Sequence, residues 1–242
     1  MTLAADARRF DPYMPATQPV APIAGYRQSQ IRNPAQAALA RPRTLSERSG
    51  PIWLAAKAKP GENNLAFLRP GVQALGALIH LGGRVLDEDG RPVRGALIEL
   101  WQCNAAGKYA HEADERDAPL DPNFRGCGRA VTDDAGCYDF LTIKPAAYPV
   151  PDSDHWWRPP HIHFSIHGDG ILSRLVTQMY FPGEPLNEHC LILNSVPDVV
   201  ARARLVATFA RPLDAAAHSA RGALAYRHDL VIRGRAQTPF VG

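Results

Sequence analysis

The sequence predicts a mainly β protein with a long N-terminal arm and a few short helices. From about residue 76 to 190, apolar and polar residues alternate in short runs, as they do in half-buried strands. The pairs Asp89-Gly90 and Ala135-Gly136 are typical of tight turns and lie between such runs. Residues 1–75, in contrast, are rich in Pro and Ala with scattered charge, which is typical of an irregular arm.

One short helix is expected in the arm, over Asn33–Ala40. Asn33 is a favourable N-cap because its side chain can accept a backbone hydrogen bond from the first turn. Pro34 is tolerated at the first helical position, where the missing N–H costs nothing. The composition of the arm alone would make it a candidate for disorder.

Four central segments show the alternation expected of short strands: Leu97–Gln102, Cys137–Ile143, His161–His167 and Arg174–Phe181. Helical spacing follows at Asp198–Ala210, with a cap expected near Ser195. Leu224–Arg233 then returns to the pattern of a strand. The chain contains no internal repeat, and a β protein of this length can form one domain.

Composition and charge fit a soluble enzyme without a nucleic-acid or membrane partner. The 242 residues are 45% hydrophobic and 21% charged, and the net charge of +3 is too small and too dispersed to indicate nucleic acid. No apolar run could span a bilayer, and the N-terminus has no signal-peptide pattern. The four cysteines form no Cys-x-x-Cys pair and are too sparse for a disulfide framework. We therefore expect free thiols and a cytoplasmic protein.

The candidate metal ligands begin with two histidines on one predicted strand. Successive side chains of a strand point to opposite faces, so His161 and His163 share one face while Ile162 and Phe164 occupy the other. Two neutral imidazoles on one face make half of a metal site. A lone His-x-His is also common at surfaces and in cores, so the pair alone does not decide the function.

Two tyrosines precede these histidines and change their interpretation. Tyr148 lies in a proline-rich loop, and Tyr109 follows the segment Leu100–Lys108. A tyrosine has a pKa of about 10 in water and becomes a good ligand only when a strongly polarising cation removes its proton. Two phenolates with two imidazoles suit ferric iron better than zinc, which prefers Cys, His and carboxylate.

The segments around these residues resemble a known family. The shared segments, in chain order, are Leu100–Tyr109, Ala118–Phe124, Thr142–Pro145, Tyr148-Pro149, Trp157–Pro159, His161–Phe164, Thr177–Phe181 and Leu224–Gly234, with looser similarity at Tyr26 and Leu45–Pro51. They resemble the intradiol ring-cleavage dioxygenases, above all the iron-bearing β chains of the protocatechuate 3,4-dioxygenases. So many segments in the same order along the chain are stronger evidence than any single short motif, which could match by accident.

The resemblance implies a fold and an activity. It implies an antiparallel β-sandwich as the catalytic domain, over residues 76–242, with the arm of residues 1–75 packed on the core and closing the pocket. The implied activity needs Fe(3+) and inserts O2 between the two hydroxylated carbons of an acid-substituted catechol. In this family protocatechuate gives 3-carboxy-cis,cis-muconate.

The resemblance also assigns the metal and catalytic residues. It makes Tyr109, Tyr148, His161 and His163 the iron ligands. Two anionic phenolates would hold the iron in its ferric state, in which it acts as a Lewis acid. Tyr148 would also take a substrate proton. Arg158 would stabilise negative charge that develops on the ring, a role suited to a fixed cation.

A second group of residues is implied to shape the substrate pocket. Gln178 matches a polar residue near the ring, and its alternative is an ordinary strand glutamine. Tyr26 and Arg32 would hold the substrate carboxylate, and Trp157 would bind the substrate beside the catalytic arginine. Val150 stands where the family usually has Trp, so we expect a wider pocket wall at the substituent end.

Three alternatives and the partners remain open from the sequence. The same chemistry could act on a different substituted catechol. The chain could be an iron-free structural or binding subunit, as the α chain of the related enzyme is, although such a chain would lack some of the ligands. A zinc or ferrous site could combine His161 and His163 with Asp152 or Asp154.

The resemblance implies a homologous α chain in a larger assembly, and a homo-oligomer is the alternative.

Overall fold

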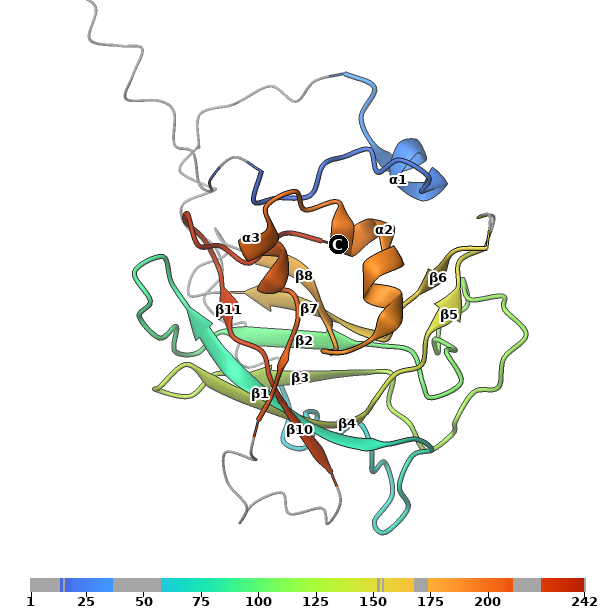
Figure 1. Cartoon of the computed structure of the whole chain (residues 1–242). Coiled ribbons are helices and arrows are strands. Elements are labelled where there is room, and N and C mark those ends of the chain that lie inside the picture. Colours follow the sequence, from blue (N-terminus) through green and yellow to red (C-terminus); the bar gives the residue numbers. More distant parts are fainter. Residues whose placement is uncertain are drawn as a thin grey trace, which may run out of the picture.

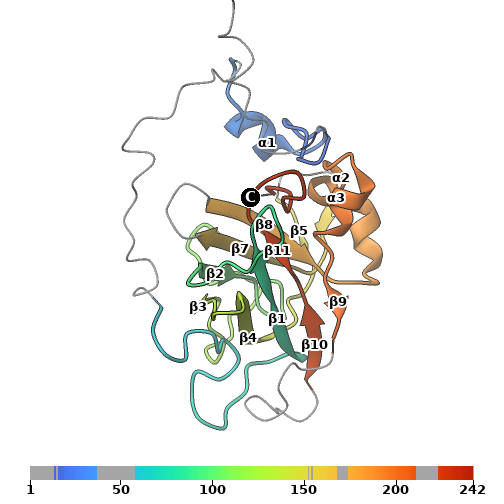
Figure 2. The ribbon, with the colours of Figure 1, turned by 90° about the vertical axis from the view of Figure 1, so that its left-hand side faces the viewer.

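Two β-sheets packed around one core form the body of the molecule (Figures 1 and 2). The computed structural model describes residues 14, 16–36, 58–151, 153, 155–167, 174–210 and 223–241. The core contains apolar side chains from both sheets, so each sheet buries one face against the other. The predicted β-sandwich is confirmed. No helix in the described ranges is both long and apolar enough to cross a membrane.

The first sheet is built around one long strand. β1 (Leu78–Leu86) pairs antiparallel with β4 (Cys137–Ile143) and parallel with β10 (Leu224–Arg227) and β11 (Leu230–Val231). β9 (Thr208–Phe209) extends the sheet beyond β10. The sandwich is therefore not antiparallel throughout. A helical segment follows β8, and the chain then returns to the first sheet in strands that run parallel to β1.

The second sheet carries the predicted histidine strand. Its strands β3 (Cys127–Val131), β2 (Leu97–Trp101), β7 (His161–His167) and β8 (Arg174–Tyr180) are all antiparallel, in that order. Ile162 and Phe164 of β7 belong to the core between the sheets, as the alternation predicts. His161 and His163 consequently lie on the outer face of this sheet.

Helices, a hairpin and the arm cover part of that outer face. The hairpin strands are β5 (Tyr148–Pro149) and β6 (Trp157–Arg158), and the helices are the 3-10 helix η4 (Pro185–His189), α2 (Leu191–Asn194), α3 (Val199–Ala203) and α1 (Arg27–Arg32) of the arm. A second apolar cluster, with Trp156, Tyr180 and Leu193 among its members, lies under them. Figures 1 and 2 both show α1 beyond α2 and α3, at one end of the molecule.

The four central strands lie where the alternation predicts them, to within one residue at either end. The predicted strand Leu224–Arg233 is broken, because residues 228 and 229 leave the ladder between β10 and β11. The segment 58–75, which we assigned to the arm, places Leu65, Ala66 and Ala74 in the main core. Sequence composition did not reveal that burial.

Both predicted helices are wrong in extent. The arm helix ends rather than begins at Asn33, which is the C-cap of α1 with ψ of 137°. Pro34 explains this, because a proline disfavours the helical conformation in the residue before it. Residues 34–36 are not helical, and residues 37–40 lie outside the described residues. The later helix spans only Val199–Ala203, and its cap is Asp198, whose side chain accepts a hydrogen bond from the Ala201 N–H.

His228 makes the stability of the fold pH-dependent. Its side chain is buried, Nε2 has no hydrogen-bond partner among the described residues, and burial lowers its pKa to about 4. The unfolded chain therefore binds this proton first, near pH 6.5, so stability falls as the pH drops from about 6.5 to 4. Replacing His228 by Phe should remove roughly 3 kcal/mol of that fall. Urea unfolding of both proteins at pH 7 and pH 4.5 measures this difference. An equal loss of unfolding free energy between the two pH values in both proteins would contradict the assignment.

Candidate active site

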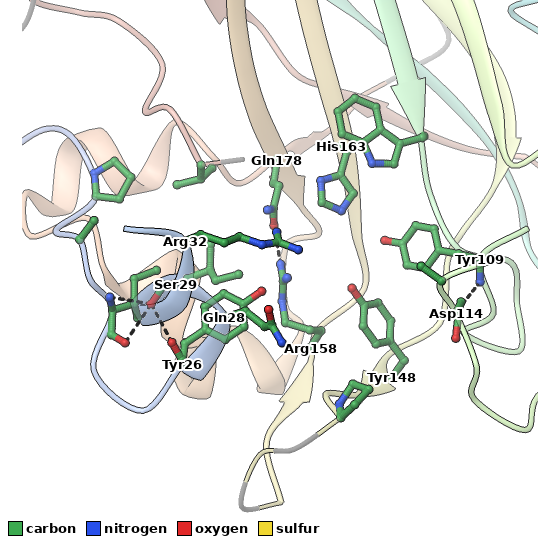
Figure 3. A pocket seen from close by; sticks show the side chains of 18 of the residues that line it. Tyr26, Gln28, Ser29, Arg32, Tyr109, Asp114, Tyr148, Arg158, His163 and Gln178 are labelled. Carbon is green, nitrogen blue, oxygen red and sulfur yellow. Dashed lines mark hydrogen bonds between the residues drawn. The ribbon is translucent and has the colours of Figure 1, made fainter. Parts of the chain in front are cut away.

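A cavity of about 1230 Å³ lies on the outer face of the β2–β7–β8 sheet. Residues from several separate parts of the chain line it, among them Trp101, His163 and Gln178 from the strands, Tyr109, Asp114 and Arg116 from the loop after β2, Tyr148 and Arg158 from the hairpin, Tyr26 and Arg32 from the arm, Ile192 from α2, and Phe240 and Val241 near the C-terminus. Figure 3 shows the hydroxyls of Tyr109 and Tyr148 directed toward the imidazole of His163. The fold thus brings together residues that are far apart in sequence.

All four predicted metal ligands lie side by side. The ring centroids of His161 and His163 are 5.0 Å apart, and those of Tyr148 and His161 are 5.5 Å apart. The Tyr109 ring lies 5.7 Å from the Tyr148 ring and 6.3 Å from the His163 ring. Two imidazole and two phenol groups therefore share one small region at the inner end of the cavity.

His161 has its orientation and tautomer set by a backbone carbonyl. Its Nδ1 lies 2.6 Å from the Pro159 carbonyl oxygen, which can only accept a hydrogen bond, so Nδ1 carries the proton. Nε2 then carries a lone pair, which accepts from the Tyr148 hydroxyl at 3.4 Å. Complete burial, with the Arg158 cation nearby, lowers the pKa of His161 well below its usual value. The imidazole is neutral, as a metal ligand must be.

His163 packs against an aromatic ring. It stacks on Trp101, with the centroids 4.9 Å apart and the planes 7° from parallel. Burial, with a smaller contribution from the Arg158 cation, lowers the pKa of His163 to about 3. This imidazole is therefore also neutral at physiological pH.

The two tyrosines are partly buried, and one hydroxyl lacks a hydrogen-bond partner in the described part of the chain. Burial raises the pKa of both Tyr109 and Tyr148, and the neighbouring phenol adds to the effect at Tyr109. The Tyr109 hydroxyl is buried without a hydrogen-bond partner among the described residues. An unpaired buried hydroxyl is costly, and a cation beside it would remove both the cost and the proton. The donor set of two phenols and two neutral imidazoles fits ferric iron.

Arg158 is a buried cation next to this cluster. It donates from Nη2 to the Gln178 side-chain oxygen and, at 3.3 Å, to the Tyr180 hydroxyl, while its Nε has no partner among the described residues. Burial alone would lower the pKa of Arg158, but the phenols of Tyr180 and Tyr148 outweigh it and raise the pKa. The Tyr180 hydroxyl also donates to Gln178, at 2.9 Å. Gln178 therefore holds the arginine in place, and the guanidinium remains charged.

The arm supplies the wall opposite the two tyrosines. Tyr26 and Arg32 line the cavity from α1, as Figure 3 shows. Ser29 closes the turn before this helix, because its hydroxyl accepts from the Ile23 N–H and donates to the Tyr26 carbonyl. The Tyr26 ring packs edge-on against Trp156, at a centroid distance of 5.2 Å.

The hairpin places Val150 and Trp157 away from the cavity wall. Tyr148 pairs with Arg158 across the β5–β6 ladder, so these two share the inner face. Pro149 and Trp157 form the next pair, which faces outward, and Trp157 is 47% exposed. Val150 packs in the apolar cluster to which Tyr26 also belongs. The wall residue at this end of the hairpin is Pro151.

Sequence reasoning missed three charged residues that line the cavity, Asp114, Glu115 and Arg116. They follow Tyr109 in an irregular loop, where neither strand nor helix periodicity indicates direction. The Arg116 guanidinium carbon lies 4.3 Å above the centroid of the Tyr148 ring. The sequence offered one signal for them, which is that the carboxylate of Asp114 and the guanidinium of Arg116 stand two residues apart.

The alternative of a zinc or ferrous site gains no support from the described residues. No group of three His, Cys, Asp or Glu in these ranges lies close enough together to bind a metal. Asp152 and Asp154, the carboxylates of that alternative, lie outside the described residues.

Comparisons with known proteins agree with this geometry. The family described as "Dioxygenase" matches residues 49–234. The chain is 46% identical over 216 residues to the protocatechuate 3,4-dioxygenase β chain of Burkholderia cepacia, with 88% of this chain and 89% of the relative covered. It is 31% identical over 207 residues to the α chain from Pseudomonas putida, with 82% and 96% covered.

A solved structure shares the architecture. Catechol 1,2-dioxygenase from Acinetobacter sp. ADP1, inhibited by bound mercury, superposes with a TM-score of 0.53 at 25% identity. The match covers 71% of this chain and 58% of that structure, so the chain spans less than two thirds of its length.

The two-sheet fold, with paired phenols and imidazoles over the outer face of one sheet, defines a ring-cleaving dioxygenase of the intradiol class. The chain belongs to this family, in its protocatechuate 3,4-dioxygenase β type.

Proposed function

We propose that this chain binds Fe(III) and cleaves protocatechuate to 3-carboxy-cis,cis-muconate. The observation that carries the proposal is the donor cluster of Tyr109, Tyr148, His161 and His163, in which the buried Tyr109 hydroxyl has no hydrogen-bond partner within the described part of the chain. The similarity to protocatechuate 3,4-dioxygenase β chains supports the substrate. When bound, the ferric ion would act as a Lewis acid that favours loss of the catechol protons.

The chain's own residues then have distinct tasks. While it holds the ferric ion, the Tyr148 oxygen at the cavity wall would be a phenolate, and it can then accept a substrate proton. Arg158, fixed by Gln178, stabilises the negative charge that develops on the ring. Tyr26 and Arg32 lie across the cavity and bind the substrate carboxylate, because they offer a hydroxyl and a cation.

We also propose that the active form includes a homologous α chain. The similarity to both the α and β chains of protocatechuate 3,4-dioxygenases supports such a pair. A homo-oligomer is the alternative, and co-expression with a homologous α chain followed by size-exclusion chromatography separates the two.

The test is a measurement of metal, colour and product on the purified chain, with its partner if it copurifies. We expect about one iron per chain, a red to burgundy colour from phenolate-to-iron charge transfer, and ring opening between the two hydroxylated carbons. A colourless protein that binds zinc or ferrous iron would contradict the proposal. A metal-free chain that only supports an active partner would favour the binding-subunit alternative.

Specificity is expected to depend on position 150 through the arm. Val150 and Tyr26 pack against the same apolar cluster, which contains Trp156, so a Trp in place of Val150 adds bulk to the packing that supports a proposed substrate-binding tyrosine. Overpacking of this kind costs about 1 to 3 kcal/mol and should displace Tyr26. We expect Val150→Trp to change the ratio of kcat/KM for protocatechuate to that for a catechol with a larger anionic substituent. An unchanged ratio would show that position 150 does not act on the pocket.

A further inference from the structure

A charged pair holds the ring of Tyr148 from the side away from the arm. Asp114 accepts from Arg116 Nε at 2.8 Å and also from Nη2, so the guanidinium is bound at two points. The guanidinium carbon lies 4.3 Å from the centroid of the Tyr148 ring. Both side chains are largely buried, at 17% exposure for Arg116 and 8% for Asp114. Little solvent therefore screens the contact between the cation and the ring.

The same carboxylate also fixes the backbone of the other tyrosine. The Tyr109 N–H donates to Asp114 Oδ2 at 2.8 Å, as the dashed line in Figure 3 shows. Lys108 closes this loop further by donating to the Asp114 carbonyl at 2.6 Å. One aspartate thus connects the segment of Tyr109 to the cation above Tyr148, although these tyrosines lie on separate elements.

We propose that Arg116, clamped by Asp114, is a positioning residue for Tyr148. The cation holds the face of the ring and so fixes the direction of its hydroxyl toward His161 Nε2. The planar fork of arginine suits this task, because one edge binds the carboxylate while the plane covers the ring. Lysine could supply the charge but not both contacts. The role in turnover rests on the proposed function, whereas the contact itself does not.

The first test uses the iron-loaded full chain with Arg116→Gln and Arg116→Lys. A cation beside a phenolate stabilises its electrons, so Arg116→Gln should move the visible charge-transfer band to longer wavelength. We expect kcat to fall about 2- to 30-fold, the range of a cation–π contact, with KM changed much less. Arg116→Lys should recover part of both effects. Arg91→Gln is the matched control, because Arg91 also pairs with an aspartate two residues away but on an exposed turn.

The opposite pattern would overturn the proposal. An unchanged band with unchanged kcat and a raised KM would make Arg116 an anion-binding residue for the substrate instead. Loss of iron in the Gln and Lys variants alike, with the control intact, would show that the pair only supports the loop.

A second test needs neither iron nor substrate. In the metal-free full chain, urea unfolding of Arg116→Gln, Tyr148→Leu and the double variant measures the coupling between the two side chains. We expect the unfolding equilibrium constants to deviate from additivity by about 2- to 30-fold. Additive effects of the two substitutions on the free energy of unfolding would show that the side chains do not interact, and this would overturn the proposal. A colourless, inactive wild-type protein would instead refute the proposed function, and this cycle would still decide whether Arg116 positions Tyr148.

Discussion

Replacing His163 by Ala should abolish iron binding and bleach the visible band. The substitution removes a neutral imidazole that lies 5.0 Å from the His161 ring and stacks on Trp101. Three donors would remain, two of them phenols whose pKa values burial holds above the usual range. Without the second imidazole, the site offers too few ligands to offset the cost of deprotonating both tyrosines. We expect activity to fall below detection.

Metal content by mass spectrometry and the visible spectrum measure this effect. His189→Ala is the matched control, because His189 is an exposed histidine on η4, outside the cavity wall. Full iron content and full colour in His163→Ala would sink the ligand assignment. Loss of iron in both variants would point to general destabilisation instead.

Replacing Arg158 by Ala should lower turnover by about 100-fold, on the scale found for losing one preorganised charge-stabilising donor. The arginine is a buried cation that faces the Tyr148 and Tyr180 phenols, and Gln178 fixes its direction. It is not one of the proposed donors, so iron content and the visible band should remain nearly intact. Single-turnover measurements on the loaded enzyme would locate the loss in the chemical step.

Arg158→Lys serves as the comparison variant, because it keeps a charge but loses the fork that reaches Gln178 and Tyr180. We expect it to recover only part of the activity. Full turnover in Arg158→Ala would refute a role for this cation in the reaction. A collapse of iron content in that variant would show that Arg158 acts by holding the ligands instead.

Two-residue alternation was the strongest sequence signal, and it predicted both the core and the histidine face of β7. That period follows from strand geometry and does not depend on distant contacts, so a single sequence reveals it. The tyrosine positions came from resemblance, because Tyr109 lies in an irregular loop that periodicity cannot describe. The order of the strands, with parallel pairing at β1, also depends on a long crossover that leaves no local pattern.

The errors have local causes that compete with the pattern we used. Asn33 is a good N-cap in isolation, but Pro34 makes it the end of a helix. The position of Trp157 depends on its cross-strand partner, Pro149, which no single segment reveals. Asp114 and Arg116 could not be assigned from the sequence, because the contact of the guanidinium with Tyr148 forms only when the hairpin folds beneath it.

The helix that carries Tyr26 and Arg32 buries none of its own residues. Six residues are too few to form a stable helix in water, so α1 depends on contacts at its ends, such as the Tyr26 ring against Trp156. A substrate that binds this helix therefore strengthens its docking, and by thermodynamic reciprocity a firmly docked helix raises the affinity for substrate. On the proposed function, part of the free energy of binding the substrate carboxylate orders one wall of the cavity, and substitutions at Trp156 would change affinity without contacting the ligand.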